Sequence, residues 1–168
     1  QILPLKIPCL VEKPLVVGVA QGEDLLRLVE TYPTDIMVNH IQLFHPAYQR
    51  LKELSSQLGP IRRIQSAGGN VGPVRVGYSS LWDYGPHDLS MCLDLLAEFP
   101  SHIKAEKAEG ENYHLVLGFP SGTTASIHIG SQFAKKVRRF EVDFDTATLI
   151  YDDICQEKLI FIKGDTHE

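Results

Sequence analysis

Six short strand-like segments follow Pro100, and they limit the fold more than any other feature of this sequence. Phe140 and Val142 alternate with Glu141 and Asp143, which is the period of a strand with one buried face. The intervening turns are short and polar, so we expect antiparallel pairing, because parallel strands need long crossovers. The predicted strands are residues 103–109, 113–119, 123–132, 137–144, 148–152 and 158–162.

The amino-terminal residues alternate between strands and a helix instead. An apolar run at 8–12 stops at Lys13-Pro14, where the missing proline N–H predicts the end of a strand. A helix with acidic residues in its first turn is expected at 23–30, and a buried strand at 35–39. This strand–helix–strand order predicts that residues 1–39 are the last part of a Rossmann-type parallel α/β domain.

Residues 40–168 are predicted to form one α+β domain with a large, mainly antiparallel sheet and helices on one face. A helix should begin at His45 with Pro46 in its first turn, followed by a strand at 61–66. The glycine-rich stretch 68–80 is expected to be a loop. Another helix is expected to start near Pro86.

Composition excludes several classes of protein. The 168 residues carry a net charge of −5 at pH 7, which argues against a nucleic-acid surface, and Arg138-Arg139 and the other basic doublets are expected on a solvated sheet face. No apolar run is long enough to span a membrane, so no membrane association is expected. Three widely spaced cysteines support neither a zinc site nor a disulfide framework, and a cytoplasmic setting is expected.

Asp83 and His87 are the first candidates for chemistry. If the helix starts at Pro86, His87 lies in the first turn, where the helix dipole disfavours the imidazolium and favours a neutral general base. Asp83 could orient that imidazole or accept a hydrogen bond from a substrate hydroxyl. Lys13 ends a strand where open α/β sheets bind ligands. The alternatives remain open that Asp83 is a helix cap, that His87 is a surface residue and that Lys13 is an exposed strand end.

Taken in order, LVEKPL, the strand ending VNH, the helix FHPAYQRLKEL and the motif DYGPHDL resemble the Gfo/Idh/MocA family of oxidoreductases. The resemblance implies hydride transfer between NAD or NADP and a carbon of a sugar, sugar derivative or cyclitol. It implies that Lys13, Asp83 and His87 are catalytic, with His87 as the base, and that Glu12, Lys13 and Pro14 contact the cofactor. It also implies a homodimer or homotetramer associated through the sheet.

The glycine-rich phosphate loop of that family has no counterpart here, because the glycines at 68–72 do not join an obvious strand to a helix. We therefore expect the main cofactor-binding domain to lie outside residues 1–168, and this chain alone to be inactive. His40, Gln42, Tyr78, Trp82 and Tyr84 are candidates for lining a polyol pocket, with Trp82 offering a ring to a sugar face.

Two other readings stay open. A metal site drawn from His40, His45, Asp83 and His87 has no pair of histidines four residues apart on one helix to support it, so no metal is expected. A non-catalytic scaffold that assembles through its sheet is the alternative to an enzyme. The sequence determines neither the substrate nor the choice between NAD and NADP.

Overall fold

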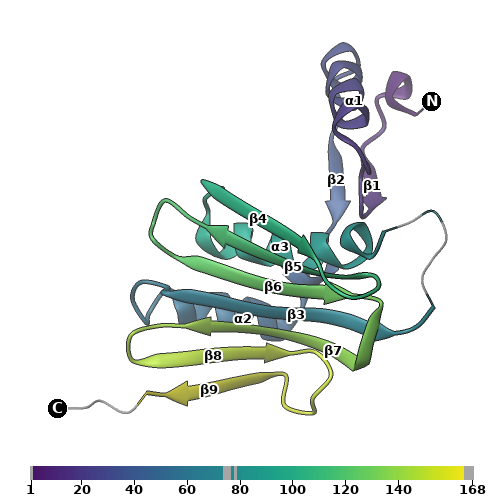
Figure 1. Ribbon diagram of the computed structural model, residues 1–168. Coiled ribbons are helices and arrows are strands. Elements are labelled where there is room, and N and C mark those ends of the chain that lie inside the picture. The colour runs from purple at the N-terminus through teal and green to yellow at the C-terminus, as the bar shows by residue number, and fades with distance from the viewer. Residues whose placement is uncertain (1, 74–76, 78, 165–168) are drawn as a thin grey trace. The chain divides into compact units, whose positions relative to one another are not determined.

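The computed structural model describes residues 2–73, 77 and 79–164 (Figure 1). The chain divides into two compact units, Gln1–His40 and Ile41–Glu168. Each unit is described by itself below. No described helix is long and apolar enough to cross a membrane.

The first unit is a parallel strand–helix–strand. A short 3-10 helix η1 (Leu3–Leu5) precedes β1 (Cys9–Glu12), α1 (Val19–Thr31) and β2 (Ile36–Asn39). The strands pair from Cys9 opposite Ile36 to Glu12 opposite Asn39. The helix begins at Val19, earlier than predicted, so its first turn contains no acidic residue and that detail of the prediction is wrong.

The second unit is built on a seven-stranded sheet in the order β4-β5-β6-β3-β7-β8-β9. Six of these strands follow Pro100 and agree closely with the predicted segments, because strict alternation fixes which residues face the core. All neighbours pair antiparallel except β3 and β6, which are parallel. The strands are β3 (Arg63–Val71), β4 (His102–Lys107), β5 (Asn112–Gly118), β6 (Thr124–Gly130), β7 (Gln132–Asp143), β8 (Ala147–Asp152) and β9 (Leu159–Lys163).

The central strand β3 corrects the expectation of a loop from Gly68 onward, because the strand continues to Val71. The absence of a side chain here serves packing rather than flexibility. A Cβ atom on Gly68 would lie 2.6 Å from Oδ2 of Asp88, so glycine lets the helix that carries Asp88 approach this strand. The strand is also the point where the parallel and antiparallel parts of the sheet meet.

Helices cover one face of this sheet, as Figure 1 shows. They are η2 (Ile41–Phe44), α2 (Pro46–Ser55) and α3 (Ser80–Leu96). The side chain of His45 caps α2 by accepting a hydrogen bond from the amide of Ala47, and Pro46 occupies the first turn, as predicted. Between helices and sheet lies one apolar core whose fully buried members include Tyr48, Leu51, Ile64, Ile127 and Phe140.

The opposite face of the sheet is mainly polar, although Val116, Ile150 and Ile162 also lie on it. Ion pairs join Arg63 to Asp143 across neighbouring strands and Arg139 to Glu141 along β7. The rings of His114 and His128, on β5 and β6, stack with centroids 4.1 Å apart. The predicted fold class, an α+β sheet domain preceded by a parallel strand–helix–strand, is therefore confirmed.

Candidate active site

The helix α3 carries both residues of the predicted Asp–His pair, but it begins at Ser80 rather than near Pro86. Ser79 caps it by accepting a hydrogen bond from the amide of Leu81. Asp83 lies in the first turn, whereas His87 lies in the middle of the helix. The prediction that the helix amino terminus holds His87 neutral is therefore wrong, because the dipole effect is confined to the first turn.

Gly85, between Asp83 and His87, explains why this turn of α3 sits close to the sheet. A Cβ atom at Gly85 would lie 3.2 Å from Cδ1 of Ile129 on β6, so a larger residue would push the helix outward. Pro86 follows inside the helix and lacks the N–H that would bond the carbonyl of Trp82. Close packing at Gly85 holds in place the stretch of helix that presents the two polar side chains.

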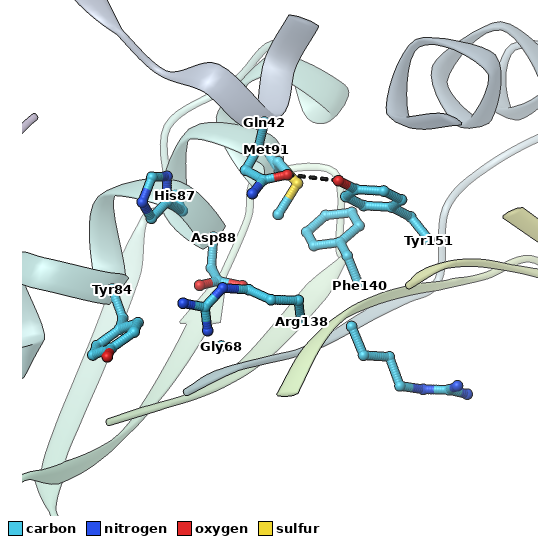
Figure 2. Close-up of a pocket in the computed structure, with 10 residues that line it drawn as sticks. Gln42, Gly68, Tyr84, His87, Asp88, Met91, Arg138, Phe140 and Tyr151 are labelled. Atoms are coloured by element: carbon cyan, nitrogen blue, oxygen red, sulfur yellow. Dashed lines mark hydrogen bonds between the residues drawn. The ribbon is translucent and has the colours of Figure 1, made fainter. Parts of the chain in front are cut away.

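Two pockets adjoin along α3. The His87 pocket is lined by the polar residues His87, Asp88, Gln42, Arg138 and Arg139, with Gly68, Tyr84, Met91, Phe140 and Tyr151 around them (Figure 2). The Asp83 pocket is lined among the described residues by Asp83, Asn70, Ser80, Tyr84 and Ser131, with Val71, Gly72 and Pro73.

Tyr84 borders both pockets, and Asp83 and His87 are one helical turn apart. The His87 pocket is narrow, with a free volume of about 10 Å³, which suits about one water molecule. The Asp83 pocket is wider, at about 270 Å³. The structure thus brings Asp83, Tyr84 and His87 together at two pockets that share Tyr84, one small and one able to hold a larger group.

Asp88, which the sequence analysis did not single out, is a buried carboxyl group in the His87 pocket. Burial raises its pKa to about 6, against the opposing influence of the hydrogen bond from the Ser66 hydroxyl and the charge of Arg138. Ser66 also contacts the carbonyl of Arg139 at 3.2 Å. Asp88 is therefore an ionisable group that changes charge near neutral pH within the pocket.

The raised pKa of Asp88 predicts how the stability of the protein changes with pH. An unfolded aspartate has a pKa of about 3.9, so between about pH 4 and pH 6 the folded chain binds more protons at Asp88 than the unfolded chain does. The contribution of Asp88 to stability should therefore fall as the pH rises through this window, by about 3 kcal/mol in all. The wild type and Asp88→Asn should be denatured at several pH values. The free energy of unfolding of the wild type should fall relative to that of Asp88→Asn as the pH rises through this window. A difference that is flat with pH would contradict the assignment, and Glu157→Gln, at an exposed site, is the matched control.

Arg138 is the other member of the pocket that the sequence analysis missed, since it was expected on a solvated sheet face. Only Arg139 is on that face, where it pairs with Glu141 at 2.7 Å. The sequence could have shown this, because side chains two residues apart in a strand lie on the same face. Arg138 is two and four residues from the buried Phe140 and Val142. Its guanidinium lies 4.9 Å from the centre of the Tyr84 ring.

The remaining candidates lie elsewhere. Trp82 is 38% exposed and borders an apolar groove with Phe99 and Ile103, so it shares neither pocket. Gln42 does line the His87 pocket, and its Oε1 accepts a hydrogen bond from the Tyr151 hydroxyl at 2.6 Å. Tyr78 lies outside the described residues.

Glu12, Lys13, Pro14 and His40 belong to the first unit. Within that unit, Asn39 at the end of β2 donates a hydrogen bond to Glu12 at the end of β1, with 2.8 Å between Nδ2 and Oε1. Lys13 and His40 therefore directly follow the carboxyl ends of two adjacent parallel strands, where open α/β sheets bind nucleotides. Burial lowers the pKa of His40. In the part of the chain that the structure describes, no three His, Cys, Asp or Glu side chains form a group able to hold a metal ion.

Comparison with known structures gives clear similarities. A protein from Magnetospirillum magnetotacticum assigned as an oxidoreductase is 33% identical, with a TM-score of 0.88 over 98% of this chain and 56% of its own length. An inositol dehydrogenase homolog from Azotobacter vinelandii, complexed with NADH and myo-inositol, is 20% identical, with a TM-score of 0.84 over 98% of this chain and 49% of its own. UDP-N-acetylglucosamine 3-dehydrogenase from Acidithiobacillus ferrooxidans is 20% identical, with a TM-score of 0.76 over 89% of this chain and 51% of its own.

The chain thus spans about half the length of the structures it matches. No family model and no curated protein matches the sequence. At 20% identity the last two similarities establish a shared fold, and the two pockets beside α3 are the features of that fold on which a function can be argued.

Proposed function

Because this chain belongs by fold to the Gfo/Idh/MocA-type oxidoreductases, of which it matches the carboxyl-terminal part, we propose that it is the substrate-binding and catalytic part of an NAD(P)-dependent oxidoreductase. The proposed reaction moves a hydride between the nicotinamide and a carbon of a sugar, sugar derivative or cyclitol. The proposed catalytic residues are Lys13, Asp83 and His87. The relatives whose names include NADH, myo-inositol and a UDP-sugar support this substrate class.

One observation carries the proposal: Asp83 and His87 lie one turn apart on α3, at two pockets that meet at Tyr84. When bound, the nicotinamide would accept the hydride. In the direction of oxidation, His87 would accept the proton of the substrate hydroxyl as the carbonyl forms, and Asp83 would hold the imidazole or a neighbouring hydroxyl. Lys13 would donate a hydrogen bond to a substrate oxygen.

The residues of the first unit fit one end of such a cofactor. Glu12, Lys13 and Pro14 follow a parallel strand at its carboxyl end, where the nicotinamide would be held. The connection from β1 to α1, however, contains no glycine-rich turn of the kind that cradles a pyrophosphate. We propose that the pyrophosphate is bound outside these 168 residues.

The exposed apolar side chains of the first unit support the proposal that further structure covers them in the complete protein. None of the residues of α1 is buried, and Leu10, Val19 and Met37 are half or more exposed. Parallel sheets are normally covered on both faces. Among the residues that the structure describes, the two-stranded sheet of the first unit is not covered in this way, so its apolar side chains are exposed to water. We propose that residues 1–39 are the end of a nucleotide-binding domain whose other strands cover these side chains.

The reaction is testable in the protein that carries the nucleotide-binding domain as well. With a panel of sugars and cyclitols, we expect reduction of NAD or NADP, and slower turnover when the hydrogen on the reacting carbon is replaced by deuterium. Lys13→Ala should reduce kcat/KM by roughly tenfold or more, the value of one charge-assisted hydrogen bond. Lys6→Ala, at an exposed lysine of the same unit, is the control. Absence of turnover across the panel would favour a non-catalytic scaffold.

Assembly through the polar face of the sheet is a further part of the proposal. That face offers ion pairs and the stacked His114 and His128 rings, which suit a polar interface between copies. Ser126, hydrogen-bonded to His114 at 2.8 Å, lies near its centre. Light scattering should report a dimer or tetramer for the wild type and a smaller species for Ser126→Arg. Ser56→Arg, on a helix end, should leave the mass unchanged, and a monomeric wild type would contradict the proposal.

A further inference from the structure

Arg138 is held firmly at the His87 pocket. Its Nη1 donates hydrogen bonds to the carbonyl oxygens of Gly69 at 3.0 Å and Val137 at 2.8 Å. The guanidinium carbon Cζ lies over the ring of Tyr84, 4.9 Å from its centre. Figure 2 shows the guanidinium beside the carboxyl group of Asp88, with His87 on the same helix. The position of this charge is therefore set by the backbone and by an aromatic ring rather than by an ion pair.

The lack of an ion pair distinguishes Arg138 from its neighbours. Arg62, Arg63 and Arg139 each have a carboxylate within 2.7 or 2.8 Å. For Arg138, no carboxylate of the described residues lies within ion-pair distance, although Asp88 is near enough to be influenced by its charge. Arg138 is half-buried, so an anion that reaches the guanidinium gains a charge-assisted hydrogen bond that water screens less than at the surface.

The donors of the pocket suit a carboxylate. A guanidinium presents parallel N–H groups that match two carboxylate oxygens, and Nη1 is the nitrogen already used by the backbone. The Tyr151 hydroxyl donates to Oε1 of Gln42, which leaves the Gln42 amide nitrogen as a further donor to the pocket. The His87 pocket admits a group of about the size of one water molecule, so a single carboxylate oxygen fits it better than a bulkier phosphate group, while a sugar ring requires the wider neighbouring space.

We infer that Arg138 binds a carboxylate of the substrate in the His87 pocket, so that the substrate is a sugar acid. This inference rests on the proposed function, because it assumes that the substrate hydroxyl lies at His87. Asp88 opposes the anion when ionised, and its pKa of about 6 means that the opposition weakens in mild acid. Asp88 and Arg138 therefore have opposite expected effects on the same ligand, which a purely structural role of either residue would not produce.

The kinetic test uses the complete protein with NAD or NADP and matched pairs of substrates. D-glucose, D-galactose and myo-inositol are compared with D-glucuronate, D-galacturonate and other sugar acids, and with sugar phosphates. We expect kcat/KM to favour an acid over its neutral partner by roughly ten- to hundredfold, the value of a charge-assisted hydrogen-bonded pair. Arg138→Met should remove this preference mainly through KM, Arg138→Lys should keep part of it, and Asp88→Asn should increase it.

Arg50→Met is the control, because Arg50 lies on α2, pairs with Glu53 and lines neither pocket. It should keep the preference for the acid. Equal turnover of acids and neutral sugars, with Arg138→Met affecting both alike, would overturn the carboxylate site but leave the proposed function standing. A preference for phosphates would overturn the carboxylate assignment.

Binding measurements distinguish failure of the proposed function from failure of the carboxylate site. If no substrate of the panel is oxidised, the proposed function fails, and calorimetry of the acids without cofactor still tests the site. Binding of an acid that is weakened in Arg138→Met and tightened in Asp88→Asn would support the site independently of catalysis. Absence of binding by every acid of the panel to the folded wild type would overturn it.

Discussion

Replacement of His87 by alanine is expected to lower kcat of the complete protein by about 10²–10⁴-fold. The reason is that loss of a positioned general base leaves the hydroxyl proton without an acceptor in the transition state. His87 is not part of the apolar core, so the variant should fold and bind substrate with a smaller change in KM. Steady-state kinetics with the best substrate of the panel, together with circular dichroism, provide the measurement.

His102→Ala is the control for this variant, since His102 is an exposed histidine on the edge strand β4. It should retain the wild-type rate. A His87→Ala protein that turns over within a few-fold of the wild type would show that another group accepts the proton, even if the reaction itself is confirmed. Asp83→Asn is expected to lower the rate less than His87→Ala, because it acts on the base or on a substrate hydroxyl without accepting the reacting proton.

Replacement of Ile127 by alanine is expected to destabilise the second unit by about 2–5 kcal/mol, the usual cost of emptying a fully buried aliphatic site. Ile127 is fully buried on β6, where it stands opposite Leu115 on one side and Ser66 on the other. Three central strands surround the cavity that the change would create, so the sheet can relax little around it. Urea denaturation gives the change in the free energy of unfolding.

Ile154→Ala offers a comparison of the same chemistry at an exposed position in the turn after β8, where Ile154 is 44% exposed. Its effect should stay within about 0.5 kcal/mol. Similar losses for the two variants would mean that the face of β6 toward the helices is not the core. The paired result therefore tests the register of the central strands as well as the burial of one side chain.

Local patterns were sufficient where one physical rule acts alone. The strands after Pro100 were predictable because alternation with a period of two repeats over five residues or more, as at Phe140 and Val142. The helix at Pro46 was predictable because its capping signals are adjacent in the sequence. The start of α3 was not, because proline and glycine inside DYGPHDL indicate a boundary, and close packing against β6 overrides them.

The residues of the candidate site likewise divide into those that the local sequence predicted and those that only the tertiary structure revealed. The spacing of Asp83 and His87 and their resemblance to a family motif made them candidates from the sequence, but their two pockets are made by contacts from distant strands. Asp88 acquires its raised pKa only when the surrounding core excludes water from it, and the hydrogen bond from Ser66, 22 residues away, opposes that rise. Arg138 likewise reaches Tyr84 and Gly69 only through the pairing of β7 with β3.

The sequence by itself therefore determined the class of fold and the strand segments, and it marked Asp83 and His87 as a candidate pair, since each depends on residues close together in the chain. Tertiary structure decided that the guanidinium of Arg138, rather than that of Arg139, lies against Tyr84, and that the carboxyl group of Asp88 is buried. It also decided that glycine at 68 belongs to a strand. Charge, burial and close approach are set by neighbours from other strands, and pairing across the sheet brings those neighbours together.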